Sequence, residues 1–355
     1  MQTKSTLLAI LVLIVGGLDL AQGGRPSGGS MSTTGVSDTP EAVSVNTGSA
    51  KVTIRKSPWH VVLADAAGVT HTEEAEAPAF KIDGIWNTVT RVAAVRQSPD
   101  GTLDLALVLS DGRPASAKIE GLTPFAIRLT LTPGAGNLEA VRGSNRLAAE
   151  EEVYGFGEMW NGRVAQRGQA FDLYDKQGTP DECAYMPYYV TTQNYGLFLD
   201  YGGLVHFDVG KEQADRLTYE APANRYEITL ISGRRIAETV DHFIGLTGKP
   251  RIPPRWAFMP WFWLQSSPDD QYIAGYDGPK ILVAARRLRA LDIPVGVTWF
   301  EPRWETARNS FGPAPVFSLD FAALVKQLED LGLRVLAWTA PYTNPDSPNY
   351  VFGDN

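Results

Sequence analysis

A carboxylate flanked by indole rings is the feature of this 355-residue sequence whose residue types and spacing could do chemistry. Glu301 ends the apolar run IPVGVTWFE, with Trp299 just before it and Trp304 just after it. A carboxylate at the carboxyl end of a strand is where parallel α/β barrels place their ligand contacts. We therefore expect ligand binding at this position, and the surrounding elements must hold Glu301 at a strand end.

Strand and helix patterns alternate after Pro254 and would provide that position. The predicted strands are WAFMPWFW, IPVGVTWFE and RVLAWTA. Two amphipathic helices separate them: the first starts near Gly278 and has Ile281 and Leu291 on its inward face, and the second starts at a Ser318 cap. This order predicts a parallel sheet with right-handed crossovers, either doubly wound or closed into a barrel.

A glycine-rich phosphate loop does not follow any of these strands in the sequence, so a (β/α)8 TIM barrel is favoured over a nucleotide-binding sheet. Such a barrel needs about 250 residues, whereas about a hundred follow position 254. An open start of three strands would leave an unpaired edge and uncovered helix faces. We therefore expect the sequence to be the N-terminal portion of a longer polypeptide, with the barrel truncated after its third strand.

The residues before the barrel segment have the pattern of an antiparallel β-sandwich. Short alternating runs recur at regular intervals and are separated by turn residues. In FAIRLTL, for example, Ile127 and Arg128 fall on opposite faces, which is typical of a half-buried strand. The segment RRIAETVDHFIGL then changes to helical spacing. We predict a β-sandwich domain over residues 51–246, followed by the first part of a barrel over residues 247–355.

The first 50 residues divide into an apolar leader and a polar stretch. Lys4 and the run TLLAILVLIVGGLDLAQG have the length of a signal peptide, predicted here over residues 1–23. An uncleaved membrane anchor is the alternative. Residues 24–50 are rich in Gly, Ser, Thr and Pro and are predicted to be a flexible linker. We expect an exported protein, periplasmic or extracellular, without stable membrane insertion after cleavage.

Charge and cysteine content exclude several classes of partner. The formal net charge of -8 argues against a nucleic-acid ligand, because neutralising phosphates requires clustered Lys and Arg. The single cysteine, Cys183, cannot form an intramolecular disulfide, and the four histidines show no metal-binding repeat. The sequence therefore predicts neither a metal nor a cofactor.

Six segments, taken in order, resemble glycoside hydrolase family 31, the retaining α-glycosidases that include α-glucosidases and α-xylosidases. The similarity begins near Lys51 and runs to the end of the sequence. Each segment alone is a moderate signal, but six in the right order are hard to obtain by chance. The segments are VTIRKSPWHVVLADAAG, EEVYGFGE, AYMPYYVTTQNYGLFLDYG, TGKPRIPPRWA, IPVGVTWFEPRW and LEDLGLRVLAWTAPY.

The resemblance implies a galactose-mutarotase-like β-sandwich followed by a (β/α)8 barrel that cleaves α-linked sugars with retention of configuration. Retention requires two carboxyl groups about 5 to 5.5 Å apart, one as nucleophile and one as acid/base. In the family these are aspartates at the ends of the fourth and sixth barrel strands. We expect both downstream of Asn355, so no catalytic residue is assigned here and the fragment alone is predicted to be inactive.

The resemblance also implies sugar-binding residues. Glu301 stands where the family places an aspartate that hydrogen-bonds the sugar, and its longer side chain puts glucose specificity in doubt. Arg303 replaces a second aspartate, and this cation would favour an acidic or otherwise substituted sugar. The alternative for Glu301 is a surface carboxylate or a salt bridge to Arg303.

Aromatic and loop residues complete the predicted sugar contacts. Trp338 and Trp304 are the preferred flat faces for sugar C–H groups, whereas Trp299 fits the barrel core at least as well. Asp175 lies on a loop that in the family reaches over the barrel mouth, with Asp172 as a competitor. A turn residue that hydrogen-bonds its own backbone is the alternative for Asp175.

The function implied is an exported α-glycoside hydrolase that acts on a carbohydrate substrate. A carbohydrate-binding protein of the same fold without catalysis is the alternative, and it follows if the aspartate pair is absent. A purely structural β-sandwich is a third possibility, which leaves the aromatic and carboxylate strand end unexplained.

Overall fold

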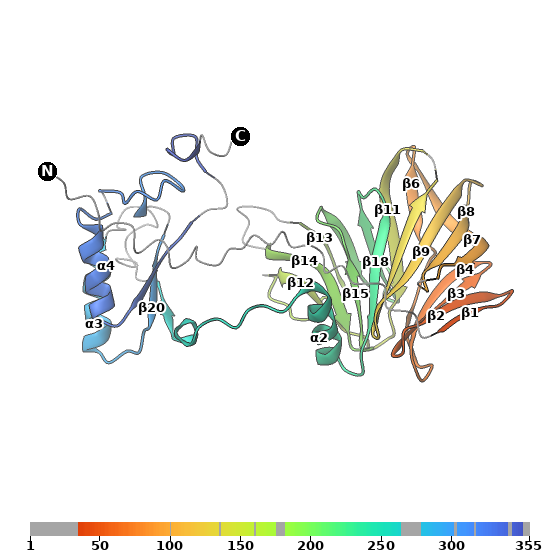
Figure 1. Cartoon of the computed structure of the whole chain (residues 1–355), viewed down its shortest axis with the longest axis horizontal. Helices are drawn as coiled ribbons and strands as arrows, with labels where there is room; N and C mark the ends of the chain where they lie inside the picture. The colour runs from red at the N-terminus through yellow and green to blue at the C-terminus, as the bar shows by residue number, and fades with distance from the viewer. Residues whose placement is uncertain are drawn as a thin grey trace. The chain divides into compact units, whose positions relative to one another are not determined.

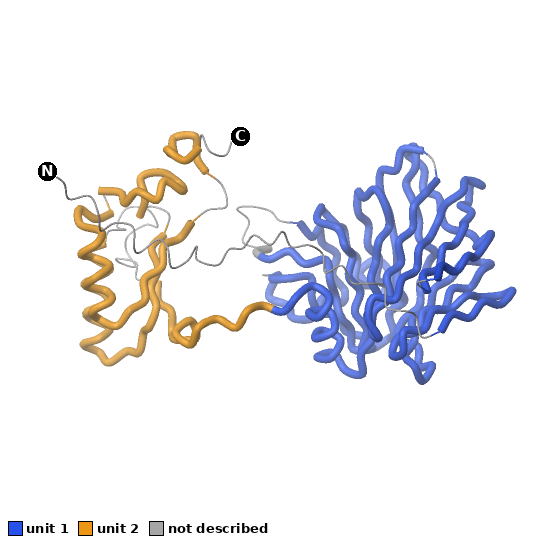
Figure 2. Tube along the Cα trace, in the orientation of Figure 1, with its two compact units in different colours: residues 1–249 blue, residues 250–355 orange. Residues whose placement is uncertain are grey.

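The chain divides into two compact units, which we call unit 1 (residues 1–249) and unit 2 (residues 250–355) (Figure 2). The structure, a computed structural model, describes residues 35–99, 101–134, 136–159, 161–174, 182–263, 278–301, 304–315, 317–339 and 343–350. The division falls after Lys249, whereas the sequence predicts a boundary after residue 246.

Five strands of unit 1 form an antiparallel sheet in sequence order. They are β1 (Gly35–Asp38), β2 (Ala42–Asn46), β3 (Ala50–Lys56), β4 (Trp59–Asp65) and β5 (Thr70–Glu73). Side chains of β2 and β3 alternate between buried and partly exposed, so this sheet has one face toward the core.

The first two strands correct the prediction of a flexible linker over residues 24–50. Val43 and Val45 are 0% and 1% exposed and alternate with the partly exposed Ser44. Strand β2 pairs with β3 from Ala42↔Arg55 to Asn46↔Lys51. Burial of the two valines and the ladder hydrogen bonds offset the entropy of ordering this Ser- and Thr-rich segment. Residues 1–34, which include the predicted signal peptide, lie outside the described residues.

Thirteen strands form the second antiparallel sheet of unit 1, and Figure 1 shows how they curve around a common interior. Their spatial order is β12-β14-β15-β18-β10-β9-β8-β7-β6-β11-β17-β16-β13. The strands are β6 (Ala79–Ile82), β7 (Ile85–Gln97), β8 (Leu103–Leu109), β9 (Pro114–Thr123), β10 (Ala126–Pro133), β11 (Leu138–Arg146), β12 (Val153–Met159), β13 (Gln169–Leu173), β14 (Glu182–Thr191), β15 (Tyr195–Leu199), β16 (Val205–Val209), β17 (Arg216–Ala221) and β18 (Tyr226–Ser232). The predicted antiparallel β architecture is confirmed for this unit.

One hydrophobic core joins the two sheets of unit 1. It includes Ile54 and Leu63 from the five-stranded sheet and Leu129 and Phe207 from the thirteen-stranded sheet. The helix α2 (Ile236–Thr247) contacts β14, β15 and β18, and its Phe243 ring stacks on Tyr188 at 3.8 Å between ring centroids. The helical pattern predicted for this segment is therefore confirmed.

The EEVYGFGE segment forms β12 and owes its shape to two glycines. Gly155, Phe156 and Gly157 have φ values of 119°, 69° and 93°, and register shifts occur here against β14. A Cβ atom on Gly157 would lie 1.7 Å from the carbonyl oxygen of Ala184. At position 157 only glycine fits this close approach, and the adjacent Phe156 side chain is 0% exposed.

In the part of unit 2 that the structure describes, three parallel strands alternate with helices, as the sequence predicts. The strands are β19 (Trp261–Phe262), β20 (Val297–Phe300) and β21 (Arg334–Ala337), in that spatial order. The helices are α3 (Gly278–Ala290) and α4 (Phe321–Asp330), with a short 3₁₀ helix η1 (Arg255–Phe258) before β19. Ile281, Ala285, Leu324 and Leu328 join the helices to Phe300 in one core.

The beginning of unit 2 differs from the predicted strand WAFMPWFW. Its first residues form η1, and β19 spans only two residues. Pro260 has no N–H to donate to a ladder, although its carbonyl accepts a 2.9 Å hydrogen bond from Gly296 N.

Two helix details also differ from the predictions. Helix α4 is capped by Asp320, whose Oδ1 accepts a 2.9 Å hydrogen bond from Ala323 N, and not by Ser318. Leu291 is 59% exposed, because α3 ends at Ala290 and the inward face does not extend beyond it.

Candidate functional site

Glu301 and Trp338 follow directly after two paired strands of unit 2. Strands β20 and β21 end side by side at the pair Phe300↔Ala337. The N–H of Trp338 donates a 2.8 Å hydrogen bond to the carbonyl oxygen of Phe300, which continues the parallel ladder. The predicted carboxylate and one predicted indole are therefore neighbours at the carboxyl edge of this sheet.

An indole hydrogen bond orients the Glu301 carboxylate. Nε1 of Trp299 donates to Oε1 of Glu301 at 2.8 Å, and both side chains are partly exposed. The Trp299 ring stacks on Trp263 at 6.4 Å between centroids with an interplanar angle of 11°, and Trp261 lies 6.2 Å away. These rings restrict the rotamer of Trp299, which in turn fixes where Glu301 presents an acceptor.

Trp338 is partly exposed and has a cation beside it. The guanidinium carbon of Arg308 lies 5.5 Å from the centroid of the Trp338 ring, within the range of a cation–π contact. The site therefore combines an oriented carboxylate, an aromatic ring and a guanidinium group, which together suit a ligand with hydroxyl groups and an apolar face.

Trp304 takes a different place from the one expected of a ligand platform. It is 5% exposed, belongs to the helix core of unit 2 and lies 5.6 Å from the Phe321 ring. Its Nε1 donates a 2.9 Å hydrogen bond to the carbonyl oxygen of Trp338. A buried indole offers no open face to a sugar, so in this structure Trp304 holds the backbone of Trp338 in place.

A second carboxylate, Glu305, was not singled out by the sequence and organises the adjacent loop. It is 5% exposed and accepts hydrogen bonds from Asn309 N at 2.9 Å and Phe311 N at 3.1 Å. Both donors have positive φ values of 58° and 55°. The loop bound to Glu305 carries Arg308 to Trp338, and an acidic residue ahead of the turn residues Asn309 and Gly312 was the only sequence signal for it.

Two predicted contacts, Asp175 and Arg303, lie outside the described residues and stay predictions. The competitor Asp172 is exposed on β13 of unit 1. Its Oδ1 lies 2.7 Å from Nδ1 of His206, the residue opposite it on β16.

The described ranges hold no group of three His, Cys, Asp or Glu residues arranged to bind a metal ion. In the same ranges, none of the helices has both the length and the apolar character needed to cross a bilayer.

Comparison with known proteins identifies the family. The model of the glycosyl hydrolase 31 N-terminal galactose mutarotase-like domain matches residues 27–208, about half of the chain. The class defined by the fold is therefore a galactose-mutarotase-like β domain, in agreement with the two antiparallel sheets of unit 1. The chain belongs to glycoside hydrolase family 31, and the resemblance found in its motifs is confirmed.

Curated relatives of the chain include α-xylosidases. The α-xylosidase XylQ of Lactiplantibacillus pentosus is 28% identical over 214 residues, which cover 57% of this chain and 26% of the relative. An α-xylosidase of Emericella nidulans is 26% identical over 213 residues, covering 58% of this chain and 26% of the relative. The chain spans about a quarter of the length of these relatives.

Solved structures share the fold at low identity. The family 31 α-xylosidase of Xanthomonas citri aligns with a TM-score of 0.61 and 14% identity, covering 90% of this chain and 45% of that protein. At this identity the likeness shows the fold alone.

Proposed function

We propose that this chain provides the N-terminal domain and part of the sugar-recognition site of an α-glycoside hydrolase. One observation supports this most strongly: Glu301 is held by the Trp299 indole beside Trp338 at a strand end, in a family whose curated relatives include α-xylosidases. An oriented carboxylate accepts hydrogen bonds from two vicinal hydroxyls, and an indole face packs against sugar C–H groups.

The reaction proposed is hydrolysis with retention, which needs two carboxyl groups about 5 to 5.5 Å apart. We propose that β19, β20 and β21 are the first strands of a (β/α)8 barrel and that the catalytic pair is supplied by residues beyond these 355. On this proposal the chain by itself binds α-glycosides and does not hydrolyse them. Export is proposed as well, because the first 23 residues have the pattern of a signal peptide.

Sugar titration of the purified chain tests the recognition site. We expect methyl α-xyloside or methyl α-glucoside to change the tryptophan fluorescence, and Glu301→Gln to weaken binding about tenfold through loss of a charged acceptor. Glu329→Gln is the matched control, because Glu329 is an exposed carboxylate on α4 of the same unit.

A parallel assay with nitrophenyl α-glycosides tests catalysis. Binding without turnover is the expected result for the chain alone. Hydrolysis by the purified chain would show that the catalytic pair had been misplaced, and absence of any fluorescence response would overturn the recognition site itself. If an extended protein carrying the downstream residues also binds without turnover, the non-catalytic alternative replaces the hydrolase.

A further inference from the structure

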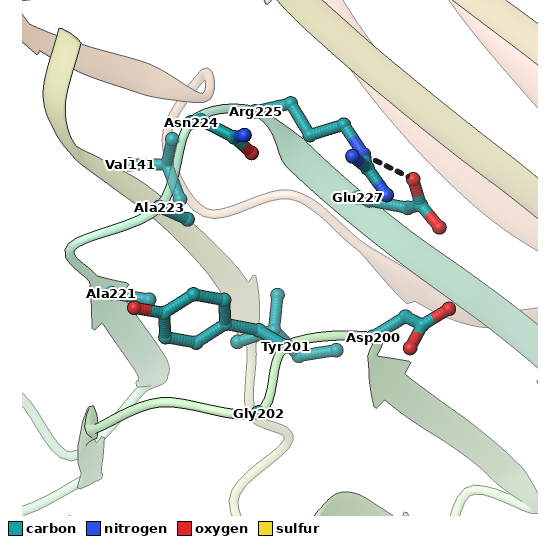
Figure 3. A pocket seen from close by; sticks show the side chains of 10 residues that line it. Val141, Asp200, Tyr201, Gly202, Ala221, Ala223, Asn224, Arg225 and Glu227 are labelled. Atoms are coloured by element: carbon teal, nitrogen blue, oxygen red, sulfur yellow. Dashed lines mark hydrogen bonds and ion pairs between the residues drawn. The ribbon is translucent and has the colours of Figure 1, made fainter. Parts of the chain in front are cut away.

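Two buried carboxylates, Glu227 of unit 1 and Glu305 of unit 2, have different kinds of partner. Glu227 lies at the wall of a hollow, and its Oε2 accepts a 2.6 Å hydrogen bond from Nε of Arg225 (Figure 3). Its Oε1 lies 3.9 Å from Nε of Arg128, so side-chain cations neutralise this carboxylate. Both oxygens of Glu305 bind backbone N–H groups instead, so Glu305 determines the shape of a loop.

The loop that Glu305 binds, residues 305–312, has an unfavourable backbone, and we call it the Glu305 loop. Asn309 and Phe311 have φ values of 58° and 55°, in the left-handed region. Asn tolerates this region, but a bulky aromatic residue rarely adopts it. Phe311 is also 46% exposed, so burial of its ring offsets little of the cost.

Glu305 stabilises this backbone at the two left-handed residues themselves. Its Oε1 accepts a 2.9 Å hydrogen bond from Asn309 N, and its Oε2 accepts a 3.1 Å hydrogen bond from Phe311 N. Hydrogen bonds to an ionised acceptor are stronger than those between neutral groups. Backbone strain of this kind is concentrated at ligand sites and persists only where the surrounding structure holds it, which suggests a functional role for the Glu305 loop.

Further contacts hold the Glu305 loop in one conformation. Glu305 and Pro313 form an antiparallel bridge that closes the base of the loop. Nδ2 of Asn349, which follows β21 in the sequence, donates a 2.7 Å hydrogen bond to the carbonyl oxygen of Asn309. A short surface loop with closed ends and internal side-chain contacts often has a functional role.

The Glu305 loop contacts Trp338 through Arg308, whose guanidinium carbon lies 5.5 Å from the centroid of the indole ring. The backbone of Trp338 is held separately, by Phe300 O at 2.8 Å and by Nε1 of Trp304 at 2.9 Å. These backbone contacts do not fix the side-chain torsions of Trp338. The cation–π contact with Arg308 favours one orientation of the ring.

We propose that Glu305 is a positioning residue of the sugar-recognition site: it holds the Glu305 loop so that Arg308 sets the orientation of the Trp338 ring beside Glu301. Glu305 is 5% exposed, so it acts through the loop and not by contact with the sugar. The inference rests on the proposed function and adds that sugar affinity depends on a buried carboxylate outside the contact surface.

Fluorescence titration of the 355-residue chain with methyl α-xyloside tests this role. Glu305→Gln keeps the size of the side chain but turns one acceptor into an NH₂ donor that faces a backbone N–H, and we expect affinity to fall about tenfold. Adding Phe311→Gly should restore most of the affinity, because glycine adopts the left-handed region without a side-chain cost. Phe311→Gly alone should bind as the wild type does. Asp320→Ala removes the cap of α4 and should also leave affinity unchanged.

The indole N–H signal of Trp338 in a ¹⁵N NMR spectrum without sugar separates this inference from the proposed function. Glu305→Gln should shift the signal, and the added Phe311→Gly should return it. A role of Glu305 in general stability alone would leave the signal in place. If the wild type does not bind sugar but the Trp338 signal still depends on Glu305, the proposed function fails while the positioning of Trp338 by Glu305 stands.

A second variant keeps the test decisive if circular dichroism shows that Glu305→Gln does not fold. Arg308→Gln leaves both hydrogen bonds of Glu305 in place and should weaken sugar binding by a similar factor. Wild-type affinity of Arg308→Gln would overturn the proposal. Wild-type affinity of a folded Glu305→Gln, or no recovery on adding Phe311→Gly, would overturn it as well.

Discussion

The two units bury their apolar residues to different degrees. In unit 1, one cluster joins both antiparallel sheets, and Phe80, Phe156 and Phe207 are all 0% exposed. In unit 2, Phe258 is 70% exposed and Phe262 is 45% exposed, although the faces of α3 and α4 meet in a compact core. The antiparallel sheets of unit 1 bury these large apolar side chains within the unit. In unit 2, apolar side chains at and just before the first parallel strand remain exposed.

This difference follows from sheet chemistry. Antiparallel sheets tolerate one solvated face, whereas parallel sheets are normally covered on both faces. Exposed apolar side chains beside the edge strand of a parallel sheet also mark surfaces that contact other protein segments or ligands. We therefore expect unit 1 to be the more stable unit and unit 2 to unfold first, and the predictions below test that ranking.

Gly157→Ala should have the largest effect on stability and should abolish the higher stability of unit 1 relative to unit 2. The new Cβ would lie 1.7 Å from a backbone oxygen of β14, so β12 must shift. We expect a loss of at least about 4 kcal/mol in the free energy of unfolding, measured by urea titration. Gly48→Ala is the matched control, because Gly48 has a similar φ of 107° but nothing within 4 Å of its Cβ position. That control should lose only about 1 to 3 kcal/mol from backbone strain, and equal losses would contradict a steric role for Gly157.

Leu328→Ala should destabilise unit 2 and leave unit 1 unchanged. Leu328 is 0% exposed on α4, and its truncation leaves a cavity in the helix core. The expected loss is about 3 kcal/mol, seen as a lower midpoint for the first of two unfolding transitions. Val283→Ala is the control on α3, since Val283 is 64% exposed. A single transition that shifts as a whole would mean that the two units do not unfold separately.

Glu74→Gln should change how the stability of unit 1 depends on pH. Burial raises the pKa of Glu74 from its ordinary value of 4.5 to about 8, although a hydrogen bond from Val61 N opposes this shift. Between these two values the unfolded chain releases the proton and the native state keeps it, so stability falls as pH rises. The slope is about 1.4 kcal/mol per pH unit.

The variant should lack this contribution because Gln cannot ionise. Urea unfolding of both proteins at pH 5, 6, 7 and 8 gives the difference directly. We expect the variant to gain stability relative to the wild type as the pH rises through this window. A difference that does not change with pH would show that Glu74 is already ionised in the native state.

Asp320→Ala should have the smallest effect, in unit 2. It removes the side-chain cap of α4 and should lower the stability of that unit by about 1 kcal/mol. Ser318→Ala is the control and should have less effect, because the cap of α4 is Asp320. If Ser318→Ala lowered the melting temperature more than Asp320→Ala, the predicted Ser318 cap would be correct.

Local alternation was enough to predict most of unit 1. Ile127 and Leu129 are buried while Arg128 between them is partly exposed, as the pattern in FAIRLTL predicts. Strand β2 was missed because the prediction relied on the Ser, Thr and Gly content of the segment and not on its alternating pattern. Val43 and Val45 do alternate as in a strand, but they lie among Ser, Thr and Gly. Composition averages over a segment, whereas strand pairing depends on single side chains and on a partner elsewhere in the chain.

The strand-end site was predicted less completely, because residue type does not determine burial. Glu301 and Trp338 lie together since parallel strands place their ends at one edge. Trp304 is buried because α4 brings Phe321 against it, and this tertiary contact leaves no local signal. The choice of Asp320 over Ser318 as the helix cap has the same origin, since both residue types cap helices well.

The central claim is that sugar recognition centres on Glu301 and the neighbouring indoles of unit 2. The nine tryptophans give separate indole N–H signals in a ¹⁵N NMR spectrum, assigned by Trp→Phe variants. We expect methyl α-xyloside to shift the signals of Trp299, which donates to Glu301, and of Trp338, while Trp59 in the core of unit 1 stays fixed. Unchanged Trp299 and Trp338 signals at saturating sugar would contradict the claim.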